Sequence, residues 1–129
     1  MGKGGSFFGA SKTEETGRSG ERLAGNFLIE KGFEIVERNY TIGAGEIDIV
    51  AKDGLSIVFV EVKTLTRSGL YNPEDQVSRS KRRRIEKAAV TWMQKHPEFP
   101  MGRFDVISIL MKKGDVEIVH FEDAWNEGE

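Results

Sequence analysis

The stretch GEIDIVAKDGLSIVFVEVKT, residues 45–64, decides the fold. Apolar residues recur on each side of Asp53-Gly54, a dipeptide typical of tight hairpin turns. We therefore expect two strands that are antiparallel neighbours. The first strand should divide into two faces, with Ile47, Ile49 and Ala51 on one and Glu46, Asp48 and Val50 on the other.

The second strand carries two opposite charges in an otherwise apolar segment. Its alternation separates Phe59, Glu61 and Lys63 from Val58, Val60 and Val62. A buried charge is costly unless it is paired, hydrogen-bonded or bound to a metal. A solvated salt bridge between Glu61 and Lys63 is the simplest interpretation.

Asp48 gives a second interpretation, because the hairpin register brings it beside Glu61. Two neighbouring carboxylates repel each other unless a cation lies between them. Mg²⁺ prefers oxygen ligands and keeps several waters, so it suits a pair of carboxylates. Lys63 would then hold or activate a water, or stabilise charge that develops on a phosphate.

Composition narrows the class of metal site. The chain has 129 residues, which suits one domain that folds without disulfides or a structural metal. It has no cysteine, and its two histidines, His96 and His120, are far apart in sequence. A zinc site is therefore not expected, and any metal should be a hard cation bound by carboxylate oxygens.

The net charge of -2 hides two regions of opposite sign. Residues 79–87 hold six basic residues and one acidic residue, whereas residues 115–129 hold six acidic residues and no Lys or Arg. No apolar segment approaches the roughly 20 residues of a membrane span, and no secretory signal is visible. We expect a cytoplasmic protein that does not contact a membrane.

The remaining sequence predicts an α/β domain with a mixed sheet. A disordered tail at residues 1–16 and a helix at 18–31 precede the first three strands, and a second helix follows at 73–96. A further hairpin then turns near residues 113–115. The expected domain covers residues 17–122, followed by an acidic tail at 123–129.

The same residues resemble the PD-(D/E)xK nuclease superfamily, in which an acid on a hairpin precedes an E-x-K motif and a Glu lies on an earlier helix. Within it the chain resembles the bacterial YraN proteins of the UPF0102 family, which are similar in fold to archaeal Holliday junction resolvases. The resemblance covers about residues 17–110 and is carried by GERLAGNFL, RNY, GEIDIVAKDG, VFVEVKT, QVSRSKRRRIEKAA and RFDV.

The resemblance implies a restriction-endonuclease-like core, a mixed five-stranded sheet flanked by helices, with a metal-dependent endonuclease site. Asp48, Glu61 and the backbone carbonyl of Val62 would bind Mg²⁺ or Mn²⁺. Lys63 would assist the attacking water, and Glu21 would orient a water or complete the shell of a second ion. Resolvase-like relatives often act as dimers, so the resemblance also implies a possible homodimer.

Two positions depart from the family pattern. YraN-like sequences often have arginine directly after Asn-Tyr and after E-V-K-T, where this chain has Thr41 and Leu65. Arg67 is a candidate substitute for the second arginine. Both changes remove positive charge near the expected site, which weakens the expectation of phosphate binding.

Several candidate residues have ordinary structural alternatives. Glu21 would also stabilise the N-terminus of the first helix. Glu46 is either a further ligand or an edge charge that supports the site, and Gln76 is a second supporting candidate. Lys81 either extends over the edge of the core or reaches back to a phosphate near the metal.

The second helix carries most of the candidate nucleic-acid contacts. Its basic run is either a solvated helix face or a surface that binds the phosphate backbone. No aromatic residues interleave the run, so duplex or branched DNA fits better than unpaired bases. The candidate contacts are Arg67, Arg79, Lys81, Arg82, Arg83, Arg84 and Lys87.

The leading hypothesis from the sequence is a metal-dependent nuclease that hydrolyses phosphodiester bonds in DNA, with branched or junction DNA among its candidate substrates. The alternative is a non-catalytic nucleic-acid-binding module that retains the nuclease fold. A third hypothesis is a protein-interaction domain that uses the acidic tail. Binding of Mn²⁺ separates the first two hypotheses, and removal of residues 115–129 tests the third.

Overall fold

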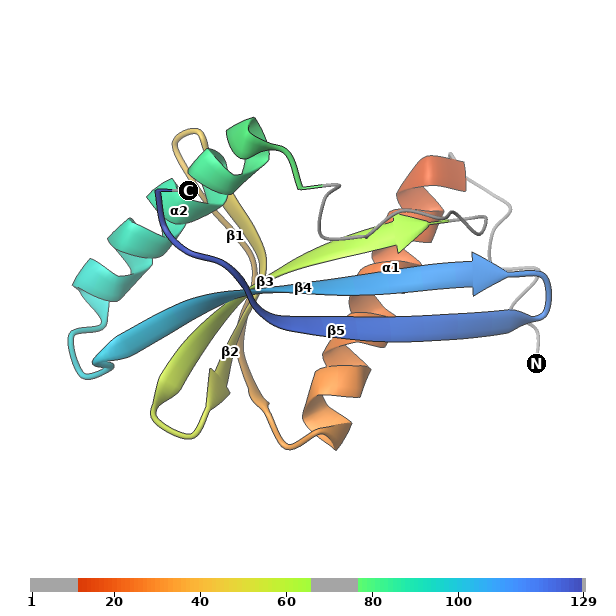
Figure 1. Ribbon diagram of the computed structural model, residues 1–129, viewed down its shortest axis with the longest axis horizontal. Coiled ribbons are helices and arrows are strands. Elements are labelled where there is room, and N and C mark those ends of the chain that lie inside the picture. The colour runs from red at the N-terminus through yellow and green to blue at the C-terminus, as the bar shows by residue number, and fades with distance from the viewer. Residues whose placement is uncertain (1–11, 66–76, 129) are drawn as a thin grey trace.

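Two helices and five strands make up the part of the chain that the computed structural model describes, residues 12–65 and 77–128 (Figure 1). No helix in these residues is long and apolar enough to cross a membrane. In chain order the elements are α1 (Lys12–Glu30), β1 (Glu34–Ile42), β2 (Gly45–Asp53), β3 (Ser56–Leu65), α2 (Arg79–Lys95), β4 (Met101–Lys112) and β5 (Asp115–Trp125).

The strands form one sheet in the order β1-β2-β3-β4-β5. Neighbouring strands are antiparallel except β3 and β4, which are parallel and are connected through α2. A parallel pair requires such a crossover because its strands run in the same direction. The predicted class, an α/β domain with a mixed five-stranded sheet flanked by helices, is confirmed.

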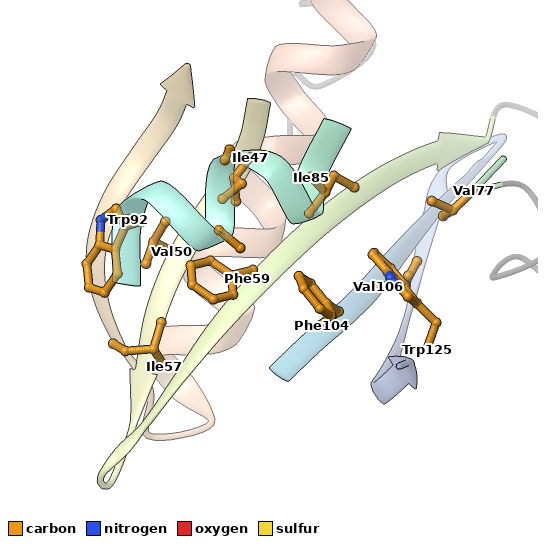
Figure 2. Close-up of a cluster of buried hydrophobic side chains, with 12 residues drawn as sticks. Ile47, Val50, Ile57, Phe59, Val77, Ile85, Trp92, Phe104, Val106 and Trp125 are labelled. Atoms are coloured by element: carbon orange, nitrogen blue, oxygen red, sulfur yellow. The ribbon is translucent and has the colours of Figure 1, made fainter. Parts of the chain in front are cut away.

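The helices cover opposite faces of β3, and each has its own apolar core. Ala24 and Leu28 of α1 pack with Val58 and Val60, whereas α2 packs on the face that carries Phe59. The predicted division of β3 into two faces is therefore confirmed. Figure 2 shows the core beneath α2, which includes Val50, Phe59, Ile85, Trp92, Phe104 and Trp125.

One side chain of β2 lies on the face opposite to the predicted one. Ile49 and Ala51 pack beneath α1 as expected, but Ile47 packs with Val50 beneath α2. The alternation breaks at Asp48, next to Asn39 of β1, whose φ of 52° is in the left-handed region. A regular pleat requires extended residues on both strands, so this distortion moves Ile47 to the other face.

The element boundaries also differ from the predicted ones. Helix α1 begins at Lys12, within the predicted tail. The sequence pattern placed the start later because the first residues of the helix are polar and show no apolar stripe. Helix α2 begins at Arg79 rather than residue 73, since Ser78 accepts a hydrogen bond from the Lys81 backbone N–H and caps the helix. Strand β5 continues to Trp125, into the segment expected to be an acidic tail.

Glycines with positive φ form the turn after α1 and the hairpin turn between β2 and β3. Gly32 has a φ of 101° and follows α1, where its N–H donates to the Ile29 carbonyl and the Phe33 N–H donates to the Leu28 carbonyl. This double hydrogen bond is the Schellman arrangement, which favours glycine because the φ is positive. The hairpin between β2 and β3 turns at Gly54, as the Asp-Gly dipeptide predicts.

Gly45 brings the start of β2 into direct contact with α2. A Cβ atom at this position would lie 2.9 Å from the backbone nitrogen of Ala88 and 3.0 Å from the backbone oxygen of Arg84. Backbone atoms in the middle of a helix cannot move independently, so only glycine permits this approach. The contact places the first turn of α2 over the neighbouring acidic residues of β2.

We expect Gly45→Ala to lower the free energy of unfolding by about 1–3 kcal/mol, because the added methyl overlaps helix backbone. Urea denaturation measures the change. Ala44→Ser, at the exposed neighbouring position, is the control and should change stability by less than about 0.5 kcal/mol. Equal stabilities for the Gly45→Ala variant and the wild type would mean that α2 does not pack against Gly45 this closely.

Candidate functional site

Strands β2 and β3 stop pairing next to Asp48. Their last paired residues are Ile49 and Val60, and β3 continues beyond this point without hydrogen-bonding to β2. The side chain of Asp48 takes the place of the backbone acceptor that β2 no longer supplies, since its Oδ2 accepts a hydrogen bond of 2.8 Å from the Val62 N–H. The end of the pairing thus brings the Asp48 carboxylate beside residues 61 and 62, as the sequence predicted.

Glu61 is buried with unsatisfied hydrogen-bonding capacity. Its side chain is 5% exposed, and among the described residues no donor reaches its Oε1. Burial, followed by the charge of Asp48, raises the pKa of Glu61 to about 8. Burial also raises the pKa of Asp48, although the Val62 N–H opposes that change. The fully ionised form of this pair is therefore disfavoured while no cation lies between the two carboxyl groups.

A divalent cation would satisfy the same pair more completely than a proton. Asp48 and Glu61 provide hard oxygen atoms, and Glu61 Oε1 lacks a partner within the described chain. No group of three or more His, Cys, Asp or Glu residues in that part of the chain is arranged around a common ion position. Two carboxylates completed by waters suit Mg²⁺ or Mn²⁺, so the residues present fit such an ion.

Glu21 approaches the pair from α1. Burial raises its pKa, and the next contribution is the charge of Asp48, which shows that these two carboxylates are close enough to interact. Arg38 of β1 opposes the increase. Sequence reasoning missed Arg38. Its guanidinium packs against Gly25 so closely that a Cβ atom at Gly25 would lie 2.6 Å from Arg38 Nη1. Gly25, one turn after Glu21 in the same helix, was the available signal.

Lys63 follows on the same face of β3 and is half-buried. Its charge lowers the pKa of Glu61, but burial and Asp48 have larger and opposite effects. Lys63 therefore lies near the acid pair, as expected. The predicted role of the Val62 carbonyl as a metal ligand stays a prediction.

Helix α2 supplies two further cations at the edge of the site. Lys81 forms a close ion pair with Glu46, and its Nζ lies 3.9 Å from Glu61 Oε2. Arg84 Nη2 also contacts Glu46, at 3.2 Å. The hydrogen bond from Lys81 lowers the pKa of Glu46. Glu46 is thus bound to α2, and Lys81 does more than extend over the core.

The other basic residues of α2 have different surroundings. Arg79, Arg83 and Lys87 are exposed, and their side chains form no ion pair with the described residues. Arg82 is half-buried and lies over the Trp125 ring, 5.5 Å from its centroid. Two candidates, Arg67 and Gln76, lie outside the described residues.

A second buried acid shows the contrasting case of a satisfied carboxylate. Asp105 is fully buried, but His120 Nε2 donates to it at 2.7 Å, Arg103 Nε at 3.0 Å and the Asp123 N–H at 2.9 Å. Burial alone would raise the pKa of Asp105, yet these hydrogen bonds lower it. Asp105 is therefore a structural charge that joins β4 to β5. Within the described part of the chain, Glu61 has no comparable set of donors.

Comparison with known proteins agrees with the motifs on this site. The model of the family described as "Uncharacterised protein family UPF0102" matches residues 20–109. The UPF0102 protein of Geotalea daltonii is 43% identical over 92% of this chain and 94% of its own. That of Geobacter metallireducens is 47% identical over 84% of this chain and 90% of its own.

Among solved structures, the chain aligns with Hjc, a Holliday junction resolvase of Archaeoglobus fulgidus, with 20% identity and a TM-score of 0.45. The alignment covers 79% of this chain and 72% of that one. A likeness at this level does not establish a shared activity. The family match and the two relatives do establish descent, and this chain belongs to the UPF0102 family.

Proposed function

We propose that this protein is a metal-dependent nuclease that hydrolyses phosphodiester bonds in DNA, branched or junction DNA included. One observation carries the proposal. Asp48 and Glu61 meet where β2 and β3 separate, and a buried oxygen of Glu61 has no partner within the described chain. Such a costly arrangement is expected at a functional site, because a purely structural carboxylate would be satisfied as Asp105 is.

The residues have distinct roles in this proposal. Asp48 and Glu61 would hold Mg²⁺ or Mn²⁺, together with the Val62 carbonyl. When bound, the ion supplies charge stabilisation at the phosphate and a water that loses its proton more readily. Lys63 orients the attacking water or stabilises the developing negative charge. Glu21, whose pKa is raised, orients a second water through its carboxyl group.

The exposed face of α2 is the proposed contact surface for nucleic acid. Arg79, Arg83 and Lys87 are four residues apart, so they follow one stripe along the helix. They form no ion pair with the described residues and so can pair with phosphates, whereas Lys81 and Arg84 are already paired with acids of the site. Contacts by Arg67 and Arg82, a supporting role for Gln76, and a homodimer stay predictions.

We expect Asp48→Asn, Glu61→Gln and Lys63→Met each to lower DNA cleavage at least about 100-fold, because each removes a group required for the reaction. The assay uses labelled branched and linear DNA with Mn²⁺ and then with EDTA.

The surface pair Lys112 and Glu117 provides matched controls, because its ion pair lies on β4 and β5 outside the acidic site. Lys112→Met and Glu117→Gln should cleave like the wild type. Cleavage that persists in all three site variants would contradict the proposed site. DNA binding without any binding of Mn²⁺ would instead support the non-catalytic module.

We expect Arg83→Gln to weaken DNA binding through loss of one phosphate contact. The slope of log affinity against log salt concentration should then fall in magnitude by about 0.9. Fluorescence anisotropy over a series of salt concentrations measures the slope. Lys112→Gln removes one positive charge from β4 and is the control. An identical slope for both variants would show that Arg83 of α2 does not contact the DNA backbone.

We expect Glu61→Gln to stabilise the metal-free protein more at pH 8 than at pH 5. The folded-state pKa of Glu61 is about 8 and the ordinary value is 4.5, so between these values the folded state binds more protons than the unfolded state. The contribution of Glu61 to stability therefore falls as pH rises through this window. Glutamine does not titrate, so it removes that dependence.

Urea denaturation in EDTA at both pH values measures this difference. Glu117→Gln, at an exposed carboxylate, should show no such trend. A stability difference between Glu61→Gln and wild type that is constant with pH would show that the Glu61 carboxyl titrates normally.

A further inference from the structure

Lys81 occupies a position where its ammonium is shared between two acids of the site. It pairs closely with Glu46 and also lies 3.9 Å from Glu61. Its side chain is only 24% exposed, so the charge is partly removed from water. The ammonium is therefore held as a cation beside Glu61.

The backbone limits how far this cation can move. Lys81 lies in the first turn of α2, where its N–H is bound to the Ser78 side chain at 3.1 Å. The close approach of Gly45 to Arg84 and Ala88, in the following turns, fixes the helix against β2. Only the flexible side chain of Lys81 can adjust, and its ion pair with Glu46 keeps the ammonium next to Glu61. Arg84 also contacts Glu46, so this acid is neutralised from two sides.

We propose that Lys81 is a tethered counter-ion that competes with the divalent cation for Glu61 and is retained by Glu46 when the cation binds. The inference rests on the proposed metal site. It assigns Lys81 and Glu46 a positioning role, in addition to the residues that hold the ion. A positive charge 3.9 Å from a ligand oxygen opposes a second cation at that oxygen.

The expected consequence is a site that binds metal weakly in the absence of nucleic acid. The repulsion between the ammonium and a doubly charged ion adds to the cost of binding the ion at Glu61. Held by Glu46, the ammonium remains beside the site when the cation binds and can pair with a substrate phosphate. Metal and nucleic acid would then favour each other's binding.

Isothermal titration calorimetry with Mn²⁺, at fixed pH and without DNA, tests the inference. We expect Lys81→Met to bind Mn²⁺ about tenfold more tightly than the wild type, because the competing charge is gone. Lys81→Arg keeps the charge and should bind within about threefold of the wild type. Lys95→Met removes the same charge from the exposed last turn of the same helix, and its affinity for Mn²⁺ should change less than about twofold.

Each other outcome has a defined meaning. Equal or weaker binding of Mn²⁺ by Lys81→Met overturns the inference and leaves the metal site intact. Binding by Lys81→Met alone, with none by the wild type, supports the inference in its strongest form. Absence of Mn²⁺ binding in every variant overturns the proposed function itself, and circular dichroism confirms that each variant is folded.

A double-mutant cycle with Glu46→Gln provides a second test that does not depend on one variant. Removing Glu46 should release Lys81 toward Glu61 and weaken Mn²⁺ binding. In the Lys81→Met background the same substitution should have at least a threefold smaller effect, because only the charge of Glu46 itself is then lost. Equal effects in both backgrounds would show that Glu46 does not act through Lys81.

Discussion

The organisation of this protein depends on a conflict between two carboxylates at the point where a pair of strands separates. Asp48 completes the hydrogen bonding of β3 by accepting from the Val62 N–H, which fixes its carboxylate beside Glu61. Glu61 is held there by the apolar packing of β3, since Phe59 and Val60 on either side of the sheet are buried. The fold thus enforces a proximity that the charges oppose.

The elements around the two carboxylates place cationic side chains near them. Helix α2 brings Lys81 and Arg84 to the acidic edge, and β1 brings Arg38 toward Glu21. Two glycines permit these approaches: Gly45 lets α2 contact β2, and Gly25 leaves space for the Arg38 guanidinium. These arginines and lysines reduce the repulsion but do not provide a donor to Glu61 Oε1. The site therefore remains suited to a further cation.

The two buried acids illustrate how structure separates a structural charge from a candidate functional one. Asp105 receives hydrogen bonds from Arg103, His120 and a backbone N–H, and its pKa is lowered despite burial. Glu61 is comparably buried, but its pKa rises to about 8. The same amino-acid chemistry gives opposite results because the number of donors around the carboxylate differs.

Sequence alone determined the order of the elements, the faces of β3 and the pairing of Asp48 with Glu61, because hairpin signals and strand alternation act over short distances. It did not determine the position of Ile47, since the distortion at Asn39 arises on a neighbouring strand. Nor did it distinguish Lys81 and Arg84, which pair with an acid of the site, from the other basic residues of the same helix, Arg79, Arg83 and Lys87. That distinction depends on where α2 packs, and only the tertiary contact with Gly45 decides it.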